Sequence, residues 1–105
     1  MKMRTAEVYV DEYLAGLLTE SDDMRYSFEY LPDYTGSSVS YTMPVTQKRF
    51  EFNTFPPFFE GLLPEGFNLD ALLMKRKIEK NDYFTQLLTV GEDMVGDVTV
   101  KPVKL

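Results

Sequence analysis

The sequence predicts an α+β domain in which an antiparallel β-sheet of about five strands is covered by three short helices. Two observations predict this fold class. Apolar and polar residues alternate along most of the first 43 residues, which is typical of strands with one buried face. From Phe55 onward, apolar residues recur at three- and four-residue spacing, which is typical of helices, before a last alternating segment near the C-terminus.

Five strands are predicted, and their ranges are 5–10, 13–18, 25–30, 39–43 and 98–103. The first two form a hairpin around the polar pair Asp11–Glu12. The third strand carries three aromatic residues on one face, namely Tyr26, Phe28 and Tyr30. Pro44 ends the fourth strand, and Pro102 marks the fifth as an edge strand or as a strand that ends there.

The first helix is predicted from an apolar stripe at helical spacing that ends at Pro64. The stripe consists of Phe55, Phe58, Phe59, Leu62 and Leu63. Asn53 or Thr54 is available as the N-cap, and prolines are tolerated in the first turn of a helix. We expect the stripe to pack against the sheet as part of the core.

The second and third helices are predicted from capping residues and charge. Asn68 is expected to cap the second helix, whose leucines share one face. Asp82 is expected to cap the third helix at 83–90, with Gly91 as a left-handed residue just after its end. The second helix ends in the basic residues Lys75, Arg76, Lys77 and Lys80. This basic end is either solvated or in contact with an acidic or phosphate-bearing partner.

Composition limits the chemistry that this chain can perform. Residues 1–105 are expected to form a single domain, and they include no histidine and no cysteine. Catalysis of the Ser-His-Asp or Cys-His type is therefore excluded, as are zinc sites built from these ligands. The adjacent acidic pairs lack the spacing of a calcium loop. We expect a protein that is not an enzyme, with no catalytic residue, no metal and no cofactor.

Charge and hydropathy restrict the class of partner. The net charge of -6 disfavours direct binding to nucleic acid. No apolar run approaches the roughly 20 residues of a membrane span, and the N-terminal segment lacks the apolar centre of a secretory signal. The absence of cysteine suits a reducing cytoplasm. We therefore expect a cytoplasmic protein that binds another protein, and neither nucleic acid nor a membrane.

The corner that follows the first helix is the candidate docking feature. Pro64, Glu65 and Gly66 are not expected to continue a helix, so they would present Glu65 and Phe67 at the tip of a turn. An aromatic side chain at such a tip is a candidate hot spot for binding. Alternatively, Phe67 packs onto the first turn of the second helix as a hydrophobic staple.

Two motifs, taken together, resemble a known family. The first is Phe-Phe-Glu-Gly-Leu-Leu-Pro-Glu-Gly at 58–66, and the second is Gly-Glu-Asp-Met-Val-Gly-Asp-Val at 91–98. In this order and at this spacing, they resemble the N-terminal subdomain of HipA-type serine/threonine kinases over nearly the whole chain. Asp97 departs from the alanine that is usual at its position. The sequence has no glycine-rich ATP loop, no catalytic Asp-Asn loop and no magnesium-binding Asp motif, so this chain cannot transfer phosphate by the kinase mechanism.

A freestanding subdomain of this kind is similar to HipS, the small component of tripartite HipBST toxin–antitoxin systems. The resemblance implies an antitoxin that binds and neutralises a HipT-like serine/threonine kinase toxin, with a HipB-like helix-turn-helix protein as a further member of the complex. It implies docking on the kinase core near the active site. The candidate kinase-binding residues are Glu65, Gly66, Phe67 and Asn68. We expect Phe67 to fill an apolar slot and Glu65 to pair with a cation of the kinase.

Other interpretations remain open. The sheet edge, rather than the corner, is an alternative inhibitory surface, and Phe67 then belongs to the core of this domain. A second alternative is an N-terminal structural lobe or scaffold subunit of a HipA-type kinase complex with no inhibitory activity of its own. A third is an unrelated small enzyme that uses a pair of carboxylates.

Overall fold

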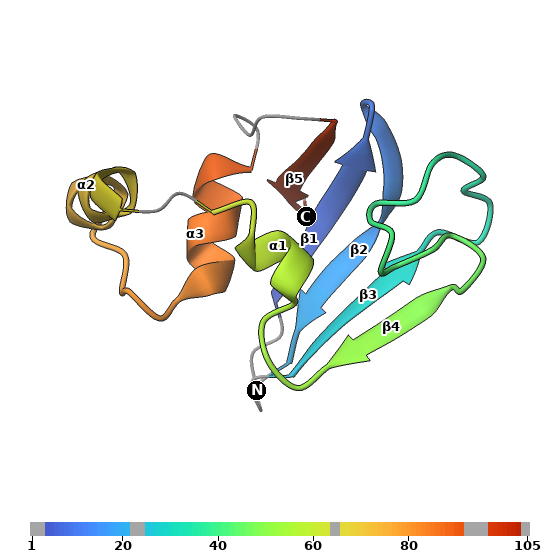
Figure 1. The fold of residues 1–105 in the computed structure, drawn as a ribbon, viewed down its shortest axis with the longest axis horizontal. Helices are drawn as coiled ribbons and strands as arrows, with labels where there is room; N and C mark the ends of the chain where they lie inside the picture. Colours follow the sequence, from blue (N-terminus) through green and yellow to red (C-terminus); the bar gives the residue numbers. More distant parts are fainter. Residues whose placement is uncertain (1–3, 22–24, 64–65, 92–96, 104–105) are drawn as a thin grey trace.

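The computed structural model describes residues 4–21, 25–63, 66–91 and 97–103, without the side chains of residues 66–68 and 76. The elements are β1 (Arg4–Val10), β2 (Tyr13–Glu20), β3 (Tyr26–Tyr30), β4 (Arg49–Phe52), α1 (Pro57–Glu60), α2 (Gly66–Arg76), α3 (Tyr83–Val90) and β5 (Val98–Pro102). The five strands form one antiparallel sheet in the order β4-β3-β2-β1-β5 (Figure 1). The predicted fold class is therefore confirmed.

Helices cover one face of this sheet. Figure 1 shows α1 and α3 beside the strands, while α2 lies beyond α3, away from the sheet. The core lies between the sheet and these helices, and its most deeply buried side chains include Val8, Leu18, Phe28, Tyr30, Val100, Phe59, Phe84 and Leu87. Burying a side chain of this size contributes about 1.5–3 kcal/mol to folding. The alternation of apolar residues in β1, β3 and β5 thus marks the covered face correctly.

The first hairpin closes with a two-residue turn. Val10 pairs with Tyr13, and the two turn residues have positive φ, 51° for Asp11 and 72° for Glu12. This conformation matches the twist of the strands that it joins. Aspartate tolerates positive φ better than most residues, whereas glutamate is less suited to it. The backbone N–H of Asp11 also donates to the carbonyl of Asp97, 2.9 Å away, and so ties the turn to the start of β5.

The predicted fourth strand at 39–43 is wrong. This segment folds around Tyr30, whose hydroxyl accepts from the Val39 N–H at 2.8 Å and donates to the Met43 carbonyl. Within the segment, Ser40 and Met43 form only an isolated bridge. The strand that pairs with β3 is instead β4, whose Arg-Phe-Glu-Phe sequence also alternates. Apolar and polar residues alternate in both segments, 39–43 and 49–52, so alternation alone did not show which one is the strand. The hydrogen bonds with Tyr30 that hold 39–43 as a loop are tertiary contacts, which local sequence does not reveal.

The first helix is shorter than predicted, although its stripe does belong to the core. Only Pro57–Glu60 is helical, and Pro56 is the N-cap, without a side-chain hydrogen bond, so neither Asn53 nor Thr54 caps it. Three residues of the stripe are buried, namely Phe55, Phe59 and Leu63. The other two, Phe58 and Leu62, are half-buried. The apolar spacing therefore indicated burial correctly but overestimated the length of the helix.

The predicted boundaries of the second helix also need correction. α2 begins at Gly66, so Asn68 lies inside its first turn and is not its N-cap. It ends at Arg76, and Lys77 follows with a φ of 55° in the left-handed region. The helix therefore starts two residues before the predicted cap and stops before Lys80, where the basic segment ends.

The third helix begins as predicted and ends differently. Asp82 is its N-cap and accepts from the Thr85 N–H at 3.2 Å. Gly91 follows its end in a right-handed conformation, with φ -60°, so the expected left-handed residue is wrong. Glycine is needed here for space, because a Cβ would lie 2.1 Å from the Val100 carbonyl oxygen. The Val100 N–H donates to the Gly91 carbonyl at 3.0 Å and joins α3 to β5.

Arg4 links the sheet to α3 through one contact within the sheet and three with α3 and its N-cap. Its Nε donates to Glu20 Oε1 of β2 at 2.7 Å. Its Nη1 donates to Thr85 Oγ1 at 2.8 Å and its Nη2 to Asp82 Oδ1 at 3.0 Å. The guanidinium carbon lies 4.9 Å from the centroid of the Phe84 ring. A side chain on the first strand therefore fixes the N-terminus of the third helix.

The acidic partners of Arg4 are part of a buried polar network. Glu20 is 8% exposed and also accepts from the Tyr26 hydroxyl at 2.9 Å. Burial raises the pKa of Tyr26 to about 12, and the hydrogen bond to Glu20 adds to this shift. At Asp82 burial opposes ionisation, but hydrogen bonds from Thr85 and Arg4 hold the pKa of this carboxyl below its ordinary value. Asp82 therefore stays charged at neutral pH and keeps its bond to Arg4.

Replacing Gly91 with alanine is expected to destabilise the domain by about 1–3 kcal/mol, because the new methyl group would overlap the backbone of β5. Gly61→Ala is the matched control. A Cβ at Gly61 meets its nearest atom, the Phe58 carbonyl oxygen, at 3.4 Å, and a change within about 0.5 kcal/mol is expected. Urea unfolding of the two variants measures both effects, and equal stabilities would contradict the close approach of α3 to β5.

The stability of the protein is expected to fall as pH rises from about 10 to about 12, with a contribution from Tyr26. Tyrosine ionises near pH 10 in the unfolded chain but near 12 in the folded one, so the unfolded state loses its proton first. Tyr26→Phe should show a shallower decline of unfolding free energy over this range. Tyr41→Phe, which alters a fully exposed hydroxyl, should keep the wild-type slope. An unchanged slope in Tyr26→Phe would refute the assignment.

Candidate functional site

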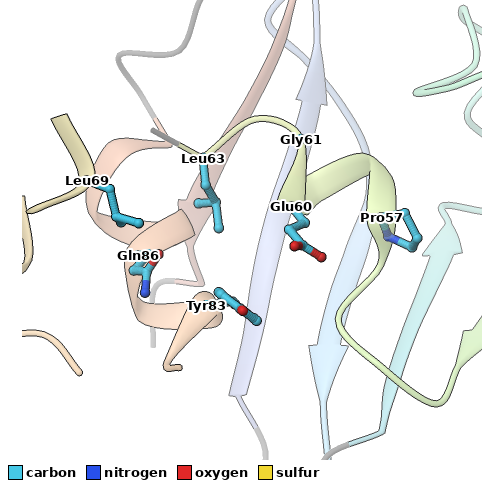
Figure 2. Close-up of a pocket in the computed structure, with 7 residues that line it drawn as sticks. All are labelled: Pro57, Glu60, Gly61, Leu63, Leu69, Tyr83 and Gln86. Carbon is cyan, nitrogen blue, oxygen red and sulfur yellow. The ribbon is translucent and has the colours of Figure 1, made fainter. Parts of the chain in front are cut away.

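A hollow lies where the three helices meet, next to the predicted docking corner. Its volume is about 410 Å³, and it is lined by Pro57, Glu60, Gly61, Leu63, Leu69, Tyr83 and Gln86 (Figure 2). Leu63 precedes the corner and Leu69 follows it, so the predicted kinase-binding residues connect two residues that line the hollow. The sequence located the corner, but the hollow depends on the packing of three helices and left no local signal.

The floor of the hollow is fixed by α3. Gln86 is 1% exposed, and its amide nitrogen donates to the carbonyls of Glu79 at 3.3 Å and Lys80 at 2.9 Å. These bonds hold the connection between α2 and α3 against the start of α3. Leu63 is 9% exposed and adds an apolar surface beside this amide. A buried amide and a buried leucine therefore give the floor both polar and apolar character.

The rim of the hollow is aromatic and acidic. Tyr83 is 37% exposed, and its ring packs against Phe55 with a centroid separation of 5.5 Å. Glu60 and Pro57 are exposed on the opposite side, and Figure 2 shows Glu60 and Tyr83 on the two sides of the opening. Since Phe55 is buried, it supports the tyrosine ring from within the core.

The structure places only part of the predicted docking corner. Glu65 lies outside the described residues, whereas Gly66, Phe67 and Asn68 form the first turn of α2. The side chains of these three residues are not described. A staple needs a residue that precedes the N-cap, and Phe67 lies inside α2, so the staple before an Asn68 cap is wrong. Docking by Phe67 stays a prediction.

The exposed surface of α2 has basic and apolar character. Lys75, Lys77 and Lys80 are exposed, as expected for a solvated helix end, and Met74 is 82% exposed. Leu69, Leu72 and Leu73 are half-buried. An acidic or phosphate-bearing partner for the basic residues stays a prediction.

A second and larger hollow was missed by the sequence interpretation. Its volume is about 750 Å³, and its lining residues are Ser37, Ser38, Val39, Ser40, Tyr41, Pro44 and Phe58. It lies beside the loop at 39–43, where the sequence predicts a strand, and Tyr41 in that loop is fully exposed. The hollow was not predicted because residues 39–43, three of which line it, were assigned to a strand of the sheet instead of a loop.

Two further observations concern sites that the sequence disfavoured. Within the described ranges, no three acidic, histidine or cysteine side chains lie close enough together to hold a metal ion. Across the same ranges, no helix is both long and apolar enough to cross a membrane.

The sequence profile of the HipA N-terminal domain matches residues 6–101, which is nearly the whole chain. The chain belongs to the HipA N-terminal domain family. An uncharacterized protein of Haemophilus influenzae is 34% identical to this HipA N-terminal domain protein over 102 residues, which cover 97% of this chain and 95% of the relative. A solved structure, the N-terminal domain of HipA toxin, is 32% identical, with a TM-score of 0.78, and the match covers 96% of this chain and 93% of that one.

These comparisons agree with the resemblance seen in the two sequence motifs. They match the N-terminal domain of HipA, which is not the kinase catalytic domain. The H. influenzae relative has only a small fraction of its length outside the match, which leaves no room in it for a kinase domain.

Proposed function

We propose that this HipA N-terminal domain protein is a HipS-like antitoxin that binds and neutralises a HipT-like serine/threonine kinase toxin in the cytoplasm. The observation that supports it is the family match over nearly the whole chain, shared with a relative too short to include a kinase domain. A protein such as that relative, which has this subdomain without a kinase core, is suited to bind such a core in trans. A HipB-like helix-turn-helix protein is the proposed further member of the complex.

The corner between α1 and α2 is the proposed contact with the kinase. α2 lies beyond α3, away from the sheet, so a partner that contacts this helix need not disturb the core (Figure 1). In the proposed arrangement Phe67 fills an apolar slot near the active site of the kinase, and Glu65 pairs with a kinase cation. The sheet edge, either β4 or β5, is the rival surface.

The second candidate function is a structural lobe or scaffold subunit of a HipA-type kinase complex, without inhibitory activity of its own. The similarity to a solved N-terminal domain of HipA toxin favours it, because that domain is described as part of a toxin. Both candidates require binding to a kinase. They differ in whether binding lowers phosphate transfer.

We expect one equivalent of this protein to suppress phosphate incorporation by the kinase encoded in the neighbouring gene and to co-elute with it in size-exclusion chromatography. Autophosphorylation with labelled ATP measures the activity. Bovine serum albumin at the same concentration is the control for nonspecific effects. Co-elution with unchanged activity would favour the scaffold subunit, and separate elution would refute both candidates.

Phe67→Ala is expected to weaken kinase binding by about 2 kcal/mol, or roughly 30-fold, if the corner docks as proposed. Tyr13→Ala removes another aromatic side chain, 73% exposed and at the far end of the first hairpin, and is the matched control. Titration of kinase inhibition measures both variants, with urea unfolding to show that each is folded. Wild-type inhibition by folded Phe67→Ala would exclude the corner and direct attention to the sheet edge.

A further inference from the structure

We propose that the hollow between α1, α2 and α3 binds an arginine side chain from a basic segment of a partner protein. The inference goes beyond the proposed function, because it names the chemistry of the occupant and does not require the partner to be a kinase. Five lining residues carry it, and they are Glu60, Leu63, Leu69, Tyr83 and Gln86 (Figure 2).

The first observation is a carboxylate without a cation. Glu60 is exposed on the rim, and the ion pairs within the described residues run through Arg4 and Arg49, so none of them reaches Glu60. The net charge of -6 adds a field that favours a cationic visitor over an anionic one. A cation that binds Glu60 therefore breaks no ion pair among the described residues.

The second observation is a supported aromatic ring. Tyr83 presents part of its ring to solvent, and its contact with Phe55 holds that ring at the rim. A cation within about 6 Å of such a ring is attracted by its π-electrons, and a guanidinium can also stack on it. Tyr83 and Glu60 thus offer two attractions to one cationic group.

The third observation is the state of the buried amide. The two hydrogens of the Gln86 amide nitrogen are donated to the carbonyls of Glu79 and Lys80. The atom that remains for an incoming group is the acceptor oxygen. This amide therefore suits a donor and not an acceptor.

The chemistry of the lining residues favours arginine over lysine. Leu63 and Leu69 give apolar walls for a methylene stem, as long cationic side chains require. A planar guanidinium with five donors can stack on Tyr83 while it donates to Glu60 and Gln86, whereas an ammonium is a strongly hydrated point charge. These features together favour arginine.

The test is a titration of the isotope-labelled protein with N-acetyl-arginine-amide, followed by the backbone amide signals of Gly61 and Gln86. We expect saturable shifts confined to the hollow, with a dissociation constant on the order of millimolar for so small a probe. N-acetyl-citrulline-amide, which has nearly the same shape without the charge, should cause much smaller shifts. N-acetyl-lysine-amide should bind more weakly than the arginine probe.

Glu60→Gln is expected to weaken binding of the arginine probe about threefold or more. Glu51→Gln is the matched control, since it removes an exposed carboxylate from β4, outside the hollow. Equal binding of citrulline, unchanged binding by Glu60→Gln, or shifts outside the hollow would each overturn the inference. None of these results would bear on kinase inhibition, which its own assay tests. Conversely, arginine binding without kinase inhibition would refute the proposed function and leave the arginine site standing.

Discussion

The position of α3 depends on the guanidinium of Arg4. This one group satisfies a nearly buried glutamate on β2, two polar groups at the start of α3 and the ring of Phe84. Removing this cation would leave the carboxylate of Glu20, which is 8% exposed, without its charged partner and would destabilise the fold. The network therefore joins β1, β2 and the N-terminus of α3 through one side chain.

The position of α3 in turn restricts where the connection to α2 can lie. Its far end is held against β5 by the close approach at Gly91, and its buried Gln86 holds the connection that leads back to α2. The short helix α1 is placed separately, because Phe59 anchors it over the sheet next to Phe28, with ring centroids 6.1 Å apart. The hollow is thus formed where two independently anchored segments face each other.

The sequence predicted those features that depend on local patterns. Residue spacing predicts the alternation in β1 and β3 and the burial of the apolar stripe. The cap at Asp82 depends on one side chain beside one backbone group. The sequence could not predict features that depend on distant contacts. The loop at 39–43 binds the Tyr30 hydroxyl, while the fourth strand forms at 49–52. Gly91 is required by a carbonyl nine residues away. The hollow combines residues from three helices, so no single window of sequence contains it.

The isolation of α2 has a consequence for how this family can diverge. Because the helix lies beyond α3 and away from the sheet, substitutions on its outer surface change few contacts with the core (Figure 1). Selection can therefore alter that surface to follow changes in another molecule while the sheet stays intact. The strands and α3, which share the core, have no such freedom. We expect sequence variation between relatives to concentrate in the second helix, even where the fold is preserved.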